Sequence, residues 1–270
     1  MAPHSNTDTQ SRAHVQFTVA IVFLTLAWIS VTLRLYVRII QIKSFGWDDV
    51  TMILAVILFS VFCTALLVVH AHGGGTHVKS LSQIENVIDW IIVSEASYIM
   101  TTMFLKVSLG IFMLRIVIKR WHQWSLYIVI ALSTLTSLFF FFFVIFMCGN
   151  PNTYFTKYMS YQCAPHDVQV ALSYTHAAIT TASDCFFALL PIAVLWNAPT
   201  MNTRSKLSVG LILSLGAAGS ICSVIRFRYI EGLTNHTDFF WNAANIAIWS
   251  CIEPGTGIVA ANLATLRPLI

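Results

Sequence analysis

Long apolar runs recur along the whole chain and are separated by short polar segments. A membrane-spanning helix needs roughly 20 mostly apolar residues, because each residue adds about 1.5 Å and the hydrocarbon core is about 30 Å thick. Seven runs meet this length, so we predict an all-α, polytopic membrane protein built as a seven-transmembrane-helix bundle. The predicted helices cover about 15–39, 48–70, 87–118, 125–148, 168–196, 207–230 and 239–265.

The predicted bundle accounts for nearly the whole chain and leaves no room for a second domain. Residues 1–14 are polar and are predicted to be a disordered extracytoplasmic N-terminus, 15–265 form the membrane domain, and 266–270 form a short cytoplasmic end. Of the 270 residues, 57% are hydrophobic and only 10% are charged, against about 25% charged in soluble domains. We therefore expect a multi-pass protein of the plasma membrane or an endomembrane, with the lipid bilayer as its first partner and no nucleic-acid partner.

The distribution of lysine and arginine predicts the orientation, because loops rich in these residues stay on the cytoplasmic side. Nine of them lie in predicted loops one, three and five and at the C-terminus, and four lie on the other side. The nine are Arg34, Arg38, Lys43, Arg115, Lys119, Arg120, Arg204, Lys206 and Arg267, and the four are Arg12, Lys79, Lys157 and Arg228. We therefore predict that the N-terminus is outside and the C-terminus inside.

Two features of the predicted outer loops agree with this orientation. Asn235 begins the only N-x-S/T sequon of the chain and is a candidate glycosylation site in the sixth loop. Cys148 and Cys163 bracket the fourth loop, where an oxidising environment allows a disulfide to persist. Such a bridge would close a loop of about 15 residues and contribute about 3 kcal/mol in the chain-entropy model.

Charged residues deep in the predicted spans are the first site candidates, because each central charge costs about 2.5–3.5 kcal/mol on insertion scales. Glu95 and Lys106 are eleven residues apart on one helix, within about 20° of each other, on a face expected to point into the bundle. Two interpretations stay open for the whole set: pairs that fix helix register, or a polar cavity that binds a ligand or transfers protons. An inner layer contains Arg34, Lys106, Asp184 and Glu253, and an outer layer contains Glu95 and Arg226.

Other polar clusters have simpler explanations. His70, His72 and His77 gather at the outer end of the second helix, where imidazoles can ligate zinc or copper. Their spacing is a weak signal in a glycine-rich loop, so we predict loop and interface histidines and no metal. Asp48 and Asp49 begin the second helix, where acids stabilise the helix dipole while remaining in water, or pair with Arg34 or Arg38.

Several sequence motifs lie along the chain: LRLYVRI (33–39), FGWDDVTMILA (45–55), GGGTH (73–77), FLKVSLGIFMLRI (104–116), SDCFFALLPIAVLW (183–196) and IWSCIEPGTGIVAANLATLRPL (248–269), with Cys148 and Cys163 between them. Together they resemble the fungal rhodopsin-like-domain family, seven-helix integral membrane proteins of the satratoxin-cluster type that are often encoded near secondary-metabolite genes. The resemblance covers nearly the whole chain.

The motifs also limit the function that the resemblance implies. Retinal proteins attach the chromophore to a lysine of the last helix, and this chain has none there, so we predict no retinal and no other cofactor. Helix three lacks the acid–arginine–aromatic triplet of G-protein-coupled receptors, and helix seven lacks N-P-x-x-Y.

Two hypotheses remain. The first is a non-enzymatic protein that binds a small hydrophobic molecule in the inner polar layer and serves secondary metabolism by sensing, trafficking or export, with other membrane or biosynthetic proteins as partners. Aromatic residues would line its outer mouth: Trp90, Tyr98, Trp241 and Trp249. The second is a membrane-bound cyclase or isomerase in which Glu253 and Asp184 act as acid and base and Lys106 biases one of them to ionise.

Overall fold

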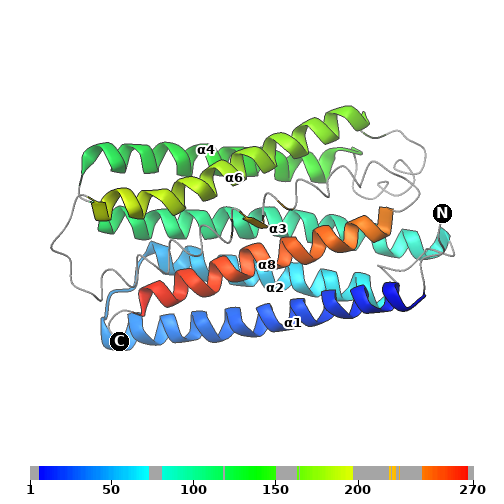
Figure 1. The fold of residues 1–270 in the computed structure, drawn as a ribbon, viewed down its shortest axis with the longest axis horizontal. Coiled ribbons are helices and arrows are strands. Elements are labelled where there is room, and N and C mark those ends of the chain that lie inside the picture. The colour runs from blue at the N-terminus through cyan, green and yellow to red at the C-terminus, as the bar shows by residue number, and fades with distance from the viewer. Residues whose placement is uncertain are drawn as a thin grey trace.

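The structure is a computed structural model that describes residues 6–72, 81–117, 119–149, 163, 165–196, 219, 221–222, 225 and 239–266. Its helices lie side by side along one axis and form an elongated bundle (Figure 1). The start of α1 and the end of α8 lie at opposite ends of this bundle. The elements are α1 (Asn6–Tyr36), η1 (Val37–Gln41), α2 (Trp47–Ala71), α3 (Leu81–Ile116), α4 (Arg120–Phe146), α6 (His166–Trp196) and α8 (Phe239–Thr265).

The predicted all-α class is confirmed, and six of the seven predicted helices have a counterpart in the described residues. Five described segments are long and apolar enough to cross a bilayer, which indicates a multi-pass membrane protein: His14–Gln41, Trp47–Ala71, Asp89–Arg115, Arg120–Phe146 and Asn245–Thr265. The predicted sixth helix, 207–230, lies almost entirely outside the described residues. The count of seven and the outward N-terminus stay predictions.

The first helix is longer than its hydropathy predicts. It begins at Asn6 instead of Val15, so residues 6–14 are helical where the sequence predicts disorder. No glycine or proline interrupts the chain between Ser5 and Val15. Because each residue added to an existing helix gains one backbone hydrogen bond, the helix propagates past the end of the apolar run.

The connection between α1 and α2 is short and tightly bonded. The π-helix η1 ends α1, and Lys43 then adopts a left-handed conformation with φ 52°, which turns the chain. Gly46 precedes α2 in an extended conformation, and its backbone N–H donates to Asp49 Oδ2 at 3.0 Å. The Asp49 backbone N–H donates in turn to the Gly46 carbonyl oxygen at 3.0 Å. These two bonds fix the start of α2 and the position of the Asp49 carboxylate.

The core lies among α1, α2, α3 and α8. The most extensive packing joins α2 to α3 and α1 to α8, while α4 packs against α3 and α6. Met52 and Phe59 of α2, Ile99 of α3 and Ile258 of α8 are fully buried in the main core cluster. The periphery of the bundle instead exposes large apolar side chains, as expected of a surface that faces lipid.

Candidate functional site

A cavity of about 60 Å³ lies between α3, α6 and α8, and it contains three of the predicted charged residues. The α3 lining residues recur at intervals of three or four positions, so they form one face of that helix. The lining residues of α8 likewise begin at Glu253 and recur one and two turns later. The lining consists of Thr102, Leu105, Lys106, Leu109 and Met113 of α3, Asp184 and Phe187 of α6, Gly219, and Glu253, Pro254, Gly257 and Ala261 of α8.

Lys106 joins α3 to α6 at the cavity. Its ammonium nitrogen Nζ lies 3.0 Å from Asp184 Oδ1 and donates to the Thr180 carbonyl oxygen at 2.9 Å and to Ser183 Oγ at 2.6 Å. The three acceptors follow one another within about one turn of α6. Lys106 is buried, so these contacts replace the water that its charge would otherwise need.

Glu253 joins α8 to α3 at the same cavity. The hydroxyl of Tyr98 donates to Glu253 Oε2 at 2.8 Å, and both residues are buried. Pro254 follows directly and lies inside α8, where it cannot donate a backbone hydrogen bond. The polar groups of the cavity are therefore held by three helices that are far apart in the sequence.

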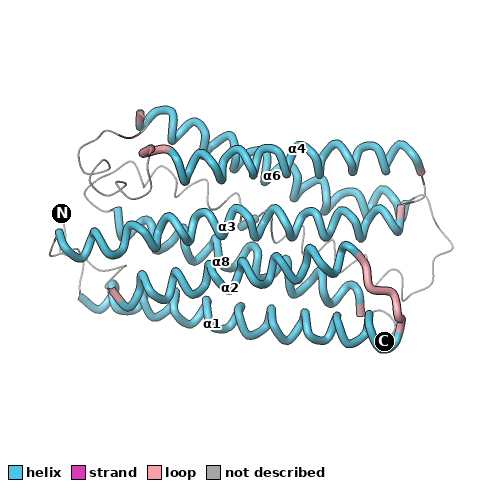
Figure 2. The backbone as a smooth tube through the Cα atoms, turned by 180° about the vertical axis from the view of Figure 1, so that it is seen from behind, coloured by secondary structure: helices cyan, strands magenta, loops and turns pink. Residues whose placement is uncertain are grey.

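A second polar centre lies where α1 meets α2, around the acids Asp48 and Asp49. Arg34 is fully buried, and its Nε and Nη2 lie 2.7 Å from Asp49 Oδ1 and 2.8 Å from Asp48 Oδ2. Arg38 Nη2 lies 3.2 Å from Asp48 Oδ2, and Arg115 Nη2 of α3 lies 2.8 Å from Asp48 Oδ1. The α1–α2 connection and the end of α3 lie together at one end of the bundle (Figure 2).

This second centre corrects two expectations. Asp48 and Asp49 are completely buried and do not remain in water, although their pairing with Arg34 and Arg38 is found. Arg34 belongs to this centre and not to an inner layer shared with Lys106, because its ion-pair partners are the two acids at the start of α2. The contribution of Arg115 was not predicted, since nothing in the sequence indicates which helix end lies beside Asp48.

The predicted outer layer of Glu95 and Arg226 stays a prediction. Glu95 is exposed whereas Lys106 is buried, so of these two residues only Lys106 is enclosed by the bundle. Two residues eleven positions apart on a helix project in nearly the same direction, but the bundle does not enclose both levels of α3 equally. Arg226 lies outside the described residues, as do Asn235 and His77.

The predicted aromatic residues have different positions. Tyr98 is bonded to Glu253, Trp90 is exposed, and Trp249 is half-buried, while the side chain of Trp241 is not described. The polar groups Thr180 and Ser183 were missed by sequence reasoning. Both lie close to Asp184 on the same helix, and this closeness is the sequence feature that could have indicated that they line the same site.

The histidines at the end of α2 make local contacts. His72 Nδ1 lies 2.9 Å from the Val68 carbonyl oxygen, and the ring of His70 packs 5.6 Å from that of Phe17. Among the residues that the structure describes, no group of three or more His, Cys, Asp or Glu side chains is placed to hold a metal ion.

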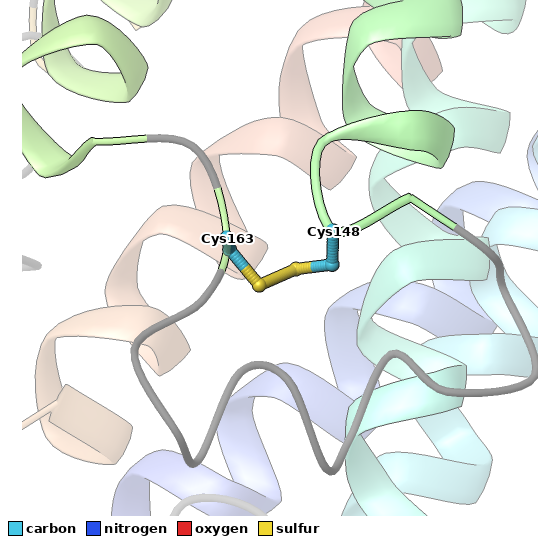
Figure 3. Close-up of a disulfide and its surroundings, with 2 residues drawn as sticks. All are labelled: Cys148 and Cys163. Atoms are coloured by element: carbon cyan, nitrogen blue, oxygen red, sulfur yellow. A yellow bond between two sulfur atoms is a disulfide. The ribbon is translucent and has the colours of Figure 1, made fainter.

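A disulfide joins Cys148, just after α4, to Cys163, just before α6 (Figure 3). The two Cα atoms are 4.2 Å apart, and the bridge closes a loop of 15 residues. It therefore ties together the ends of two neighbouring helices. The four other cysteines form no disulfide: Cys63, Cys185, Cys222 and Cys251.

Comparison with known proteins finds a family and a partial relative. The profile of the Fungal rhodopsin domain matches residues 33–270. A relative from Metarhizium anisopliae, described as "Polyenoic acids biosynthesis gene cluster protein Ba17b", is 27% identical over 99 residues, which are 33% of this chain and 26% of the relative. The similarity thus spans about a quarter of that relative's length. No solved structure is significantly similar to the chain.

Proposed function

This chain belongs to the fungal rhodopsin domain family, and we propose that it binds a small hydrophobic molecule in the cavity between α3, α6 and α8. In this proposal it is an accessory protein of secondary metabolism, acting in sensing, trafficking or export, and not an enzyme. The observation that carries the proposal is the combination of Lys106, Asp184 and Glu253 with apolar walls in one buried cavity.

The walls and polar groups of the cavity have the composition of a ligand site. Small-molecule sites are mostly apolar and contain a few polar groups that fix the orientation of the ligand. Here Leu105, Leu109, Met113 and Phe187 supply apolar surface next to the charged residues. Ionisable residues inside a membrane are expensive and usually mark a functional site, which favours a ligand site over simple packing.

The size of the cavity indicates how a ligand would enter. Pockets for drug-sized molecules measure about 300–1,000 Å³, whereas this cavity measures about 60 Å³. In this conformation it accommodates only a small group, so a larger ligand requires a helix to move. Pro254 removes one backbone hydrogen bond from α8 beside the cavity, which lowers the cost of bending α8 at this point.

The link to secondary metabolism is supported by the partial relative, whose printed name assigns it to a polyenoic acid biosynthesis cluster. The similarity covers a minority of both chains, so we take from it the metabolic setting and not a substrate.

A second candidate function is an acid–base enzyme, which the Tyr98–Glu253 bond beside the cavity favours. A positioned carboxyl group next to a bound substrate is the basis of general acid–base catalysis. The ion pair between Lys106 and Asp184 can be explained by a structural role, so it does not by itself indicate catalysis. We therefore rank the enzyme second.

The test compares three strains of the fungus that carries this gene: wild type, a deletion, and the deletion complemented with Glu253→Gln. Pathway metabolites are measured in the mycelium and in the medium, together with pathway transcripts. A matched complementation with Glu95→Gln makes the same chemical change on an exposed residue of α3.

The proposal predicts one of two results in the deletion and in Glu253→Gln, with Glu95→Gln behaving as wild type. A sensor lowers the whole pathway together with its transcripts, and an export or trafficking factor retains the end product in the mycelium. If instead one intermediate accumulates while transcripts stay normal, the protein is an enzyme and the accessory role is wrong.

A further inference from the structure

A surface at one end of the bundle carries exposed cations and aromatic rings that the proposed function does not use. We propose that this surface binds the headgroup of an anionic phospholipid. Its four cations, which we call the basic rim, are all exposed: Lys43, Arg115, Lys119 and Arg120. They come from the α1–α2 connection, the end of α3 and the start of α4, and these segments lie at the same end of the bundle (Figure 2).

Direct contacts bring the α1–α2 connection and the end of α3 together. Arg115 Nη2 lies 2.8 Å from Asp48 Oδ1, and a Cβ atom added to Gly46 would lie against the same Nη2. Lys43 precedes Gly46 by three residues, and Lys119 follows Arg115 by four. A chain covers at most about 3.5 Å per residue, so the backbone of each lysine lies within about 15 Å of Gly46 or Arg115, respectively. Cations from distant parts of the sequence are therefore gathered on one surface.

The acids at this end do not neutralise the basic rim. Asp48 and Asp49 already face three arginines, since Arg34, Arg38 and Arg115 all make ion pairs with them. Within the described part of the chain, the two lysines of the rim and its second arginine make no ion pair. The described residues therefore leave this end with an excess of positive charge.

The rest of the chain offers little to cancel that charge. Residues 197–218 lie outside the described residues, and they contain Arg204 and Lys206 but no aspartate or glutamate. They add no acidic side chain to the surface, wherever they lie. Glu231 and Asp238 precede α8 in the sequence, and α8 starts at the end of the bundle opposite the basic rim (Figure 1).

Exposed tryptophans indicate the depth of this surface in the bilayer. Trp121, Trp47 and Trp124 are 82%, 76% and 68% exposed, and they lie near the starts of α4 and α2. Tryptophan is enriched at the membrane–water interface, where its amphipathic ring sits at the level of the lipid headgroups. Trp121 directly follows Arg120 in the sequence. The basic rim therefore lies at headgroup level.

An anionic phospholipid has the chemistry that this surface requires. Its phosphate accepts charge-assisted hydrogen bonds from lysine and arginine, and clusters of four or more such residues beside a membrane span attract anionic lipids. The end is the predicted cytoplasmic one, and the cytoplasmic leaflet is the one rich in anionic lipids. A soluble anion would match the charges but would leave the exposed rings without a partner, so the combination favours a lipid.

The test measures the affinity of single lipid molecules for the purified full chain in a mild non-ionic detergent, by native mass spectrometry. Phosphatidylserine and phosphatidylcholine with identical acyl chains separate the effect of headgroup charge from that of the tails. Glycerophosphoserine, which carries the same headgroup without acyl chains, separates a lipid from a soluble anion.

Two triple variants with the same change of net charge locate the site. The rim variant keeps Arg115, which contacts Asp48, and replaces the three other cations: Lys43→Gln, Lys119→Gln and Arg120→Gln. The control variant removes three cations of the predicted outer side: Arg12→Gln, Lys79→Gln and Lys157→Gln.

A lysine or arginine beside an anionic membrane surface changes affinity about fivefold. We therefore expect the wild-type protein to bind phosphatidylserine at least about tenfold more tightly than phosphatidylcholine. The rim variant should lose most of this preference and the control variant should retain it. Glycerophosphoserine should bind at least about tenfold more weakly than phosphatidylserine, because it cannot contact the apolar surface below the rim.

Three results would overturn the proposal. The first is equal affinity of the wild-type protein for the two lipids, and the second is an equal loss of preference in the two variants. The third is binding of glycerophosphoserine as tight as that of phosphatidylserine, which would show a site for a soluble anion. If the rim variant does not fold, Lys119→Gln alone should lower the preference about fivefold, and a loss no larger than that of Lys79→Gln would contradict the assignment.

Discussion

Lys106 of α3 and Asp184 of α6 form an ion pair of 3.0 Å in the interior of a helix bundle whose outer surface is apolar. The pair joins two helices that are 78 positions apart in the sequence at these residues and defines one wall of the cavity. Its neighbour Glu253 reaches the same cavity from α8 and is held by Tyr98. The following predictions test this arrangement and the parts of the fold that support it.

Removal of the ammonium group should destabilise the bundle. Lys106→Met keeps an unbranched apolar stem but removes the ammonium group that pairs with Asp184, whose side chain is only 15% exposed. Breaking a largely buried pair in this way costs about 3–5 kcal/mol. We expect a large fall in the Tm of the purified protein in detergent. Lys119→Met, on an exposed lysine before α4, is the control and should leave Tm nearly unchanged. An unchanged Tm for Lys106→Met would show that the pair is not a structural element.

Arg34 and Arg115 both contact Asp48 but should contribute differently to stability. Arg34 is fully buried and bonds both acids, whereas the side chain of Arg115 is 43% exposed. Arg34→Met should therefore cost several kcal/mol, as expected for one partner of a buried pair, while Arg115→Met should cost about 1 kcal/mol or less, as expected near the surface. Chemical or thermal unfolding of both variants checks this order, and equal losses would contradict it.

Close approach of α1 and α8 depends on Gly255. A Cβ atom at this position would lie 2.7 Å from Cδ1 and 2.9 Å from Cβ of Phe23, so alanine forces the two helices apart. We expect Gly255→Ala to lower stability by about 1–3 kcal/mol, the usual cost of overpacking. At Gly219, where no described atom lies within 4 Å of the added Cβ, alanine should be neutral or stabilising because it favours the helix. A Gly255→Ala protein as stable as wild type would contradict the packing of α1 on α8.

The disulfide should contribute measurably to stability. Cys148→Ala removes the bridge to Cys163, and for a closed loop of 15 residues the chain-entropy model gives a loss of about 3 kcal/mol. Addition of a reducing agent should lower the Tm of the wild-type protein but not that of the variant. Cys185→Ala, at a cysteine of α6 that forms no disulfide, serves as the control and should respond to the reductant like wild type.

Glycosylation tests the predicted orientation. If the N-terminus is outside, the sequon at Asn235 lies on the outer side and should carry a glycan in a eukaryotic host. We expect endoglycosidase treatment to increase the gel mobility of the wild-type protein and to leave that of Asn235→Gln unchanged. If a tag placed at the N-terminus is accessible from the cytoplasm after selective permeabilisation of the plasma membrane, the predicted orientation is wrong.

The sequence by itself determined the helical class, the positions of most helices and the family. These properties depend on local composition, because an apolar run of sufficient length has to satisfy its backbone hydrogen bonds as a helix inside a bilayer. The predicted start of α2 at Asp48 differs from the observed Trp47 by one residue. Polar ends are less well predicted, as Asn6 shows, because helix propagation continues into water where hydropathy gives no signal.

Only the tertiary structure decided which charges meet. Position in a span gives the depth of a residue, and residues at one depth, such as Arg34 and Lys106, looked like parts of one layer. Their partners depend on the rotation and order of the helices, which arise from contacts between distant segments. Packing therefore directed Arg34 to the acids at the start of α2, Lys106 to Asp184, and Glu95 to the exposed surface.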